Sequence, residues 1–244
     1  MNDSPVALVT GSARRIGAAI NRRLHADGYS IAIHCRNSRD DADTLAQALN
    51  NIRPGSALVV QRDLNETANL RHIINAVLDA FGRLDLLVNN ASSFYPTPLD
   101  EISEEQFDDL VGSNLKAPLF LSQAALPALR ESNGSIVNIV DIHAQRPLAD
   151  HPAYLAAKAG LHMLTRSMAK DLGPGIRVNG VAPGAILWPE TEHGQDEAAQ
   201  QAVVSGIPLG RTGRPEDIAD AVAWLAQADY VSGQVIAVDG GRSV

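Results

Sequence analysis

A chain of 244 residues, 45% of them hydrophobic, is long enough to bury the core of a soluble globular domain. Its formal net charge of −8 argues against nucleic acid as a partner, and we expect neither a signal peptide nor a membrane span. Because Cys35 is the only cysteine, no disulfide can form within the chain, and we expect a cytoplasmic protein.

Short apolar runs alternate with longer stretches of helical periodicity along the whole chain. The runs are rich in Val, Ile and Leu without strict alternation, which is typical of strands buried on both faces. We expect strands at Val6–Val9, Ser30–His34, Ala57–Gln61, Leu84–Val88, Ser135–Val140, Arg177–Ala182 and Val235–Val238. We expect helices at Ile16–Asp27, Asp40–Asn50, Ala68–Phe81, Glu104–Arg130, Tyr154–Leu172 and Pro215–Ala226. This order predicts one α/β domain whose mostly parallel sheet is covered by helices on both faces.

Residues 186–205 interrupt this alternation between the sixth strand and the last helix. The segment follows the carboxyl end of a strand, where ligands bind in sheets of this kind, so we interpret it as a substrate lid. An ordinary surface loop is the alternative. Trp188 within the segment either forms a wall of the pocket or packs the lid.

A glycine-rich turn joins the first strand to the first helix. Gly11 suits a tight turn and Gly17 a close contact between helix and sheet, so that backbone N–H groups can approach a pyrophosphate. Arg15 stands where such loops usually have a third glycine, and a positive charge at a helix N-terminus is unfavourable unless an anion lies nearby. We predict that Gly11, Arg15, Ile16 and Gly17 bind a dinucleotide; a solvated arginine is the alternative.

The end of the second strand indicates which dinucleotide binds. NAD-selective sites place a carboxylate here for the ribose 2′-hydroxyl, but no acid occurs before Asp40. Arg36, with Asn37 and Ser38 as neutral donors, suits a 2′-phosphate instead. We therefore predict NADPH as the cofactor, with His34, Arg36, Asn37 and Ser38 in its site.

Two further segments follow strands at the same edge of the sheet. Asp63, beside Leu64, is placed to accept a hydrogen bond from the adenine amino group. Asn90, Ala91 and Ser92 follow the fourth strand, where backbone and amide groups can line the cofactor channel; turn formation is the alternative for the asparagine. We assign all five residues to the cofactor site.

The chemistry is expected at Tyr154 and Lys158, which share one face of a helix because they are four residues apart. A nearby ammonium favours tyrosinate and so eases proton transfer from the phenol. Such a pair is common on protein surfaces, and it becomes specific here because the preceding strand ends in Asp141. No metal site is expected, since the seven histidines show no ligand spacing.

Together these motifs resemble the short-chain dehydrogenase/reductase family over almost the whole chain. The resemblance is carried by the glycine turn, Asn89–Ala91, Asn114, the Tyr154/Lys158 pair, Arg177–Asn179 with Pro183 and Gly184, and Val238–Gly241. It implies a Rossmann-type, doubly wound sheet of about seven strands and hydride transfer with a nicotinamide. It implies that Tyr154 is the proton donor, that Lys158 holds the cofactor ribose and that Asn114 supports a water relay. Pro183 and Gly184 are expected at the cofactor, and a homotetramer built through two long helices is implied.

Departures from the general family pattern point to a subgroup. Most members have serine in place of Asp141 and glycine in place of Arg15, and both changes together resemble pteridine reductases. Residues 92–99 also match the segment that presents a phenylalanine to the pterin ring in those enzymes. The resemblance implies that Phe94 stacks on the pterin, that Ser92 bonds its edge and that Arg15 contacts both pterin and phosphate. An aspartate near Tyr154 could also relay a proton from solvent, which a serine could not.

We therefore predict NADPH-dependent reduction of a dihydropterin to a tetrahydropterin, with dihydrofolate as a further candidate substrate. The substrate site comprises Arg15, Ser92, Phe94, Asp141, Tyr154 and Trp188. One alternative is a carbonyl reductase of the same family, such as a 3-oxoacyl thioester reductase, although it leaves Arg15, Asp141 and Phe94 together unexplained. A second alternative, a non-catalytic NADP-binding sensor, is disfavoured by the intact Tyr154, Lys158 and Asn114.

Overall fold

One seven-stranded sheet organises the computed structural model, which describes residues 4–188 and 197–244. Its strand order is β3-β2-β1-β4-β5-β6-β7, and every neighbouring pair is parallel. The strands are β1 (Val6–Val9), β2 (Ser30–Cys35), β3 (Ala57–Gln61), β4 (Leu86–Asn89), β5 (Ser135–Ile139), β6 (Arg177–Pro183) and β7 (Val235–Val238). The predicted single-domain, Rossmann-type parallel sheet is confirmed.

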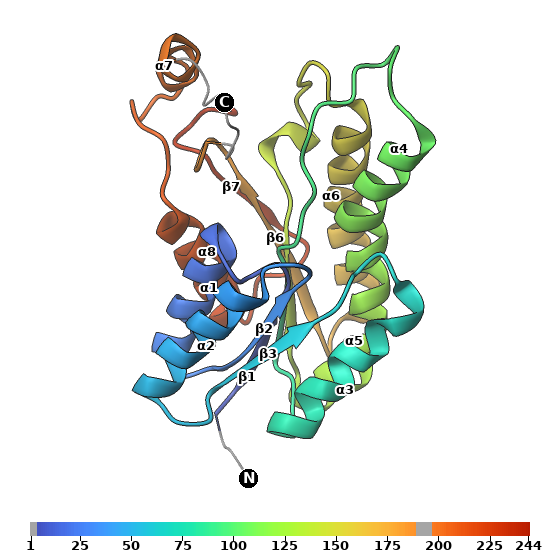
Figure 1. Ribbon diagram of the computed structural model, residues 1–244, viewed down its shortest axis with the longest axis vertical. Helices are drawn as coiled ribbons and strands as arrows, with labels where there is room; N and C mark the ends of the chain where they lie inside the picture. The colour runs from blue at the N-terminus through green and yellow to red at the C-terminus, as the bar shows by residue number, and fades with distance from the viewer. Residues whose placement is uncertain (1–3, 189–196) are drawn as a thin grey trace.

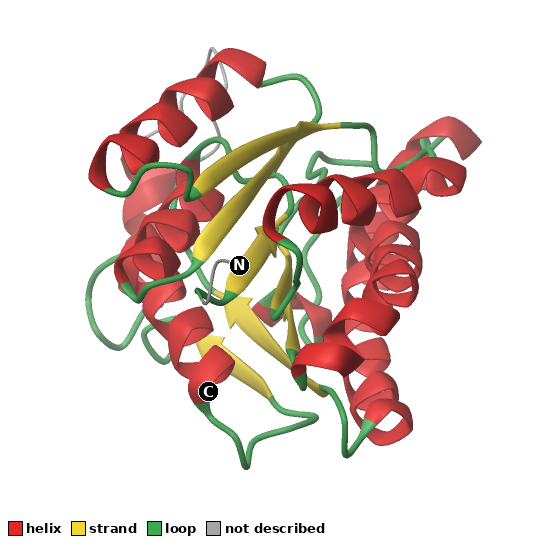
Figure 2. Ribbon diagram, turned by 90° about the horizontal axis from the view of Figure 1, so that it is seen from below, coloured by secondary structure: helices red, strands yellow, loops and turns green. Residues whose placement is uncertain are grey.

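Helices cover both faces of the sheet (Figures 1 and 2). One layer holds α1 (Arg15–Ala26), α2 (Arg39–Ile52) and α8 (Pro215–Gln227), and the other holds α3 (Leu70–Phe81), α4 (Glu104–Val111), α5 (Ala117–Ser132) and α6 (Pro152–Leu172). The short α7 (Glu197–Ser205) lies beyond the carboxyl end of β6. A separate apolar core fills the space between the sheet and each layer, which explains why most strand residues are apolar on both faces. None of the helices among the described residues is long and apolar enough to cross a membrane.

The strand order reverses direction between β1 and β4. From β1 the chain first builds outward through β2 and β3, then returns to place β4 on the other side of β1. The loops that leave β1 and β4 therefore run to opposite faces of the sheet, and a crevice opens between them at the carboxyl ends of the strands. This topology places the glycine turn and residues 89–92 side by side.

The predicted helix Glu104–Arg130 is interrupted in the structure. A π-helical turn, Gly112–Lys116, separates α4 from α5, and α5 continues to Ser132. The turn contains Asn114, which is completely buried. A π turn is a rare insertion of one residue within a helical stretch, and the prediction of one continuous helix did not include it.

Candidate active site

A cavity of about 480 Å³ lies at the carboxyl ends of β1 to β4. Thirteen of the residues predicted to bind the cofactor line it: Gly11, Arg15, Ile16, Gly17, His34, Arg36, Asn37, Ser38, Asp63, Leu64, Asn90, Ala91 and Ser92. The other four lie outside this lining, with Tyr154 and Lys158 on α6, Pro183 at the end of β6 and Gly184 directly after it. The volume suits a ligand of dinucleotide size rather than a single small ion.

The glycine turn is packed too closely for larger residues. Gly11 has φ +58°, and a Cβ there would lie 2.8 Å from the Ala91 Cα. A Cβ on Gly17 would lie 2.5 Å from the Ser12 Cα. The Asn90 amide braces the turn by donating to the carbonyls of Thr10 (2.8 Å) and Gly11 (3.0 Å). Backbone N–H groups can therefore approach an anion closely at this point.

His34 supports the same turn from beneath. Its Nδ1 accepts a hydrogen bond from the Gly11 N–H at 3.2 Å, so its Nε2 is the donor to the Arg62 carbonyl at 3.1 Å. Burial lowers the pKa of His34 to about 4, which keeps the imidazole neutral in this arrangement. His34 therefore lies at the predicted cavity, but its visible role is to hold the loop.

Arg15 begins α1 in a left-handed backbone conformation with φ +54°. Its guanidinium donates to the Trp188 carbonyl at 3.1 Å. Two residues predicted at the substrate site, 173 positions apart in sequence, are thus brought together. The rest of the predicted lid is only partly visible, because residues 189–196 lie outside the described residues, while α7 forms its final part.

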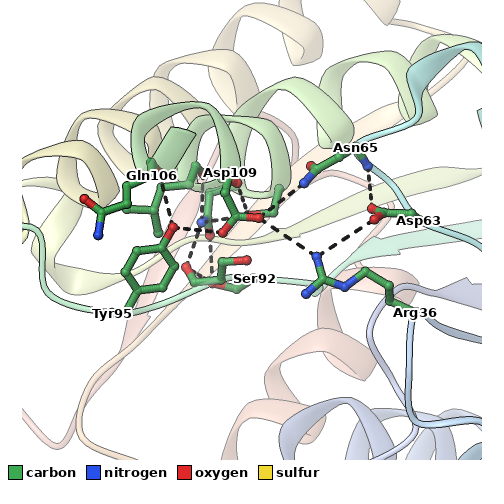
Figure 3. A network of polar contacts seen from close by, with 11 residues as sticks. Arg36, Asp63, Asn65, Ser92, Tyr95, Gln106 and Asp109 are labelled. Atoms are coloured by element: carbon green, nitrogen blue, oxygen red, sulfur yellow. Dashed lines mark hydrogen bonds and ion pairs between the residues drawn. The ribbon is translucent and has the colours of Figure 1, made fainter. Parts of the chain in front are cut away.

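Arg36 lines the cavity, and its partly exposed guanidinium points toward two carboxylates (Figure 3). Its Nη1 lies 4.0 Å from the Asp63 carboxylate and 3.9 Å from the carboxylate of Asp109 on α4. Asp63 also accepts from the Asn65 backbone N–H at 2.9 Å. Sequence reasoning missed Asp109, because an acid on the polar side of a helix carries no motif signal.

Tyr154 and Asp141 form the centre of the chemical site. The tyrosine hydroxyl donates to Asp141 Oδ2 at 2.7 Å, while Oδ1 accepts from the His143 N–H at 2.8 Å. Burial, and secondly the Asp141 charge, raise the pKa of Tyr154, and a hydrogen bond with Ser92 partly offsets the rise. The phenol is therefore firmly protonated, as a proton donor must be.

Lys158 lies one helical turn further along α6. Its ammonium is buried and donates to the Ile139 carbonyl at 2.9 Å. It lies 5.7 Å from the centre of the Tyr154 ring. Burial lowers the pKa of Lys158 to about 8, opposed by the Asp141 charge. Among the described residues no carboxylate pairs directly with this ammonium, and burial of such a charge is unfavourable, which is typical of functional sites.

Asn114 ties the π turn to the loop that follows β4. Its Oδ1 accepts from the Ser92 hydroxyl at 2.7 Å, and its amide donates to the carbonyls of Ser93 (2.9 Å) and Leu110 (3.0 Å). The wider turn thus places a buried amide where it can fix Ser92 near Tyr154. The predicted water relay from Asn114 to Lys158 stays a prediction.

Phe94 belongs to the same loop and stands beside the tyrosine. Its ring meets Tyr154 edge-on, with centroids 4.9 Å apart, and stacks on His151 at 4.7 Å with 13° between the planes. Phe94 is 48% exposed, so part of its surface is open to a ligand. Sequence reasoning missed His151, because it is a lone histidine at the start of α6.

The close approaches at Gly184 extend the site toward the C-terminus. A Cβ at Gly184 would lie 2.6 Å from that of Asp239, so the end of β6 and the last loop pack directly together. Arg146 donates to the carbonyl of Arg242 in that last loop. Within the described part of the chain, no three His, Cys, Asp or Glu side chains gather to hold a metal ion.

Comparison with known proteins places these features in a family. The model of a family described as enoyl-(acyl carrier protein) reductase matches residues 11–243. The chain is 39% identical to pteridine reductase 1 of Leishmania tarentolae over 99% of this chain and 97% of that protein. It is also 39% identical to a putative granaticin polyketide synthase ketoacyl reductase 2 of Streptomyces violaceoruber (98% and 96% covered). A 3-oxoacyl-(acyl-carrier-protein) reductase of Staphylococcus aureus is 36% identical, with 96% of each chain covered.

Proposed function

The chain belongs to the short-chain dehydrogenase/reductase family, whose oxidoreductases use nicotinamide cofactors, and from this premise we propose that it is an NADPH-dependent pteridine reductase. The observation that carries the proposal is the hydrogen bond between Tyr154 and Asp141, with Phe94 against the same tyrosine ring. This constellation combines a proton donor, an acid that can recharge it and a flat aromatic surface. Reduction of a C=N bond needs a proton at nitrogen beside the hydride at carbon, and the aromatic surface suits binding of a planar heterocycle.

The residues of the cavity fit NADPH. A Cβ at Gly11 or Gly17 would collide with the backbone of Ala91 or Ser12, so glycine allows the tight turn whose backbone N–H groups would bind the pyrophosphate. Arg36 at the end of β2 supplies a guanidinium for a 2′-phosphate, and Asn37 and Ser38 line the cavity beside it. Lys158 would hold the nicotinamide ribose, near Pro183 and Gly184. When bound, NADPH supplies the hydride.

The protein's own residues handle the proton. Tyr154 would donate to a ring nitrogen of the pterin, and Asp141, bonded to that hydroxyl, would relay a proton to it from solvent. The positive charge of Lys158 stabilises the tyrosinate left behind. The Asn114 side chain fixes the Ser92 hydroxyl, which would bond the edge of the substrate.

Phe94 provides the surface for the pterin ring. Since His151 stacks on one face of Phe94, we assign the ring to the exposed remainder of that side chain. Arg15 and Trp188, joined by a hydrogen bond, would close the site from the other side. Residues 186–205 would act as the lid, and dihydrofolate is a candidate substrate because it shares the pterin ring.

One alternative has support of its own. The ketoacyl reductases of Streptomyces and Staphylococcus match the chain at 39% and 36% identity, which makes reduction of a 3-oxoacyl thioester the second candidate function. That reaction gives no reason for an aspartate bonded to Tyr154. A non-catalytic NADP-binding sensor gives no reason to bury Lys158 beside the tyrosine.

The proposal includes a homotetramer in the cytoplasm. Leu119 and Phe120 on α5 and Met163 on α6 are exposed on the helix layer, as expected of a surface that other subunits cover. Cys35 is a free, buried thiol, which suits a reducing compartment.

The test is NADPH consumption by the purified protein with 7,8-dihydrobiopterin, 7,8-dihydromonapterin and dihydrofolate, beside an acetoacetyl thioester. We expect turnover of the pterins, faster with NADPH than with NADH, and little or none of the thioester. Turnover of the thioester alone would establish the second candidate instead. NADPH binding without turnover of any of these would support the sensor.

A further inference from the structure

The guanidinium of Arg36 lies between two carboxylates at the mouth of the cofactor cavity (Figure 3). One Arg36 nitrogen, Nη1, lies 3.9 Å from Asp109 Oδ1 and 4.0 Å from Asp63 Oδ2. All three side chains are partly exposed, by 49% for Arg36, 31% for Asp109 and 37% for Asp63. Arg36 is thus already engaged before any phosphate arrives.

Asp109 is the fixed partner in this contact. The Tyr95 hydroxyl donates to its Oδ2 at 3.0 Å, and the Asn65 amide donates to its Oδ1 at 3.3 Å. The backbone of Arg36 is also held, because its carbonyl accepts from Gln61 Nε2 at 2.8 Å. The Arg36 side chain is therefore the part that can move, and it can bind either these carboxylates or a ligand.

We infer that Asp109 is a specificity-determining residue for the cofactor, because it competes with the ribose 2′-phosphate for Arg36. NADPH must draw the guanidinium away from Asp109. NADH has no 2′-phosphate and leaves this contact in place. Asp109 therefore weakens NADPH binding selectively, which lets the used cofactor leave more readily. The inference rests on the NADPH assignment of the proposed function, but not on the pterin.

The expected effect is modest. Partly exposed ion pairs change an equilibrium by about two- to five-fold, and the contacts here are long. Replacing Asp109 by asparagine removes the charge but retains an oxygen for Tyr95 and Asn65. We expect Asp109→Asn to bind NADPH about three-fold more tightly and NADH with unchanged affinity.

The experiment measures the dissociation constants of both cofactors by fluorescence titration without substrate. Asp108→Asn is the matched control, because Asp108 is an exposed neighbour on the same helix and has no contact with Arg36 among those described. In an Arg36→Ala background, Asp109→Asn should not increase the affinity for NADPH, because the guanidinium for which Asp109 and the phosphate compete is absent. Asp109→Ser replaces the asparagine variant if thermal unfolding shows that the latter does not fold.

Four results would overturn the inference: unchanged or weaker NADPH binding by Asp109→Asn, an equal gain for NADH, an equal gain in Asp108→Asn, or a gain that survives Arg36→Ala. A wild-type protein that prefers NADH would overturn the NADPH assignment, and this inference with it. A wild-type protein that prefers NADPH but reduces no pterin would leave this inference standing while the proposed substrate falls.

Discussion

Among single side chains, Asp141 makes the sharpest difference to the proposed chemistry. Its charge raises the pKa of both Tyr154 and Lys158. With Lys158 at about 8, kcat/KM for pterin reduction should fall as the pH rises above that value, because the lysine loses its proton. Asp141→Asn lowers both pKa values, so we expect this basic limb to move to lower pH.

The same substitution removes the proton relay, and we expect kcat to fall about 100-fold, the usual lower range for general acid–base groups. Steady-state kinetics over a pH series gives both quantities. Asp171→Asn, at an exposed position near the end of α6, is the matched control. An unchanged rate and profile in Asp141→Asn would remove Asp141 from proton delivery.

Lys158 is a functional residue whose burial lowers the stability of the folded protein. Its pKa falls from 10.5 to about 8 on folding, equivalent to about 3 kcal/mol at pH 7, where both states hold the proton. Lys158→Met removes this cost and loses about 1 kcal/mol with the hydrogen bond to Ile139. We expect a variant without turnover whose free energy of unfolding is about 1–2 kcal/mol higher.

Denaturant unfolding at several pH values tests this expectation. As the pH rises from about 8 toward 10.5, the folded wild type loses the proton first, so its penalty shrinks and the advantage of Lys158→Met should disappear. Lys170→Met, exposed on the same helix, should stay within about 0.5 kcal/mol of wild type. Lower stability of Lys158→Met at pH 7 would show that the lysine is better accommodated than its burial suggests.

Among the elements, we propose that the loop after β4 contributes most to substrate recognition. Phe94 in this loop lies against Tyr154, and stacking on a planar ring is worth about 0.5–1.5 kcal/mol beyond the apolar contact. We expect Phe94→Ala to raise the pterin KM about ten-fold, with an unchanged dissociation constant for NADPH. Phe107→Ala, a similarly exposed phenylalanine on α4, is the control, and an equal effect there would contradict the assignment.

The elements that bear motifs were predictable, and those that depend on packing were not. The strands and the Tyr154/Lys158 helix could be predicted, because apolar patterning and residue spacing are properties of the local sequence. The π turn at Gly112–Lys116 and the stacking of His151 on Phe94 depend on contacts between distant segments. The position of Arg36 was foreseeable from the strand order, but its engagement by Asp109 was not, since that acid comes from the opposite layer.

At the scale of the whole molecule, the apolar composition of the strands and their alternation with helices predict the parallel sheet. They do not predict the identity of the substrate. Ketoacyl and pteridine reductases share the fold and match this chain at similar identity. We therefore propose that a few side chains, Asp141 and Phe94 above all, discriminate between the two substrates. Periodicity does not predict quaternary structure either, because a helix has the same apolar pattern whether that face packs on the sheet or on another subunit.

The exposed apolar side chains of α5 and α6 make the assembly testable. If Phe120 and Met163 are covered in a tetramer, a charge there would be buried without a partner at each symmetric interface, at a cost of several kcal/mol. We expect sedimentation to show a wild-type tetramer, and Phe120→Glu to shift it to smaller species. Ile52→Glu, at an exposed apolar position on α2 in the other layer, should remain tetrameric. A wild-type protein that is monomeric at the concentration used in the assay would refute the tetramer. Each chain would then form its active site without contacts from other subunits.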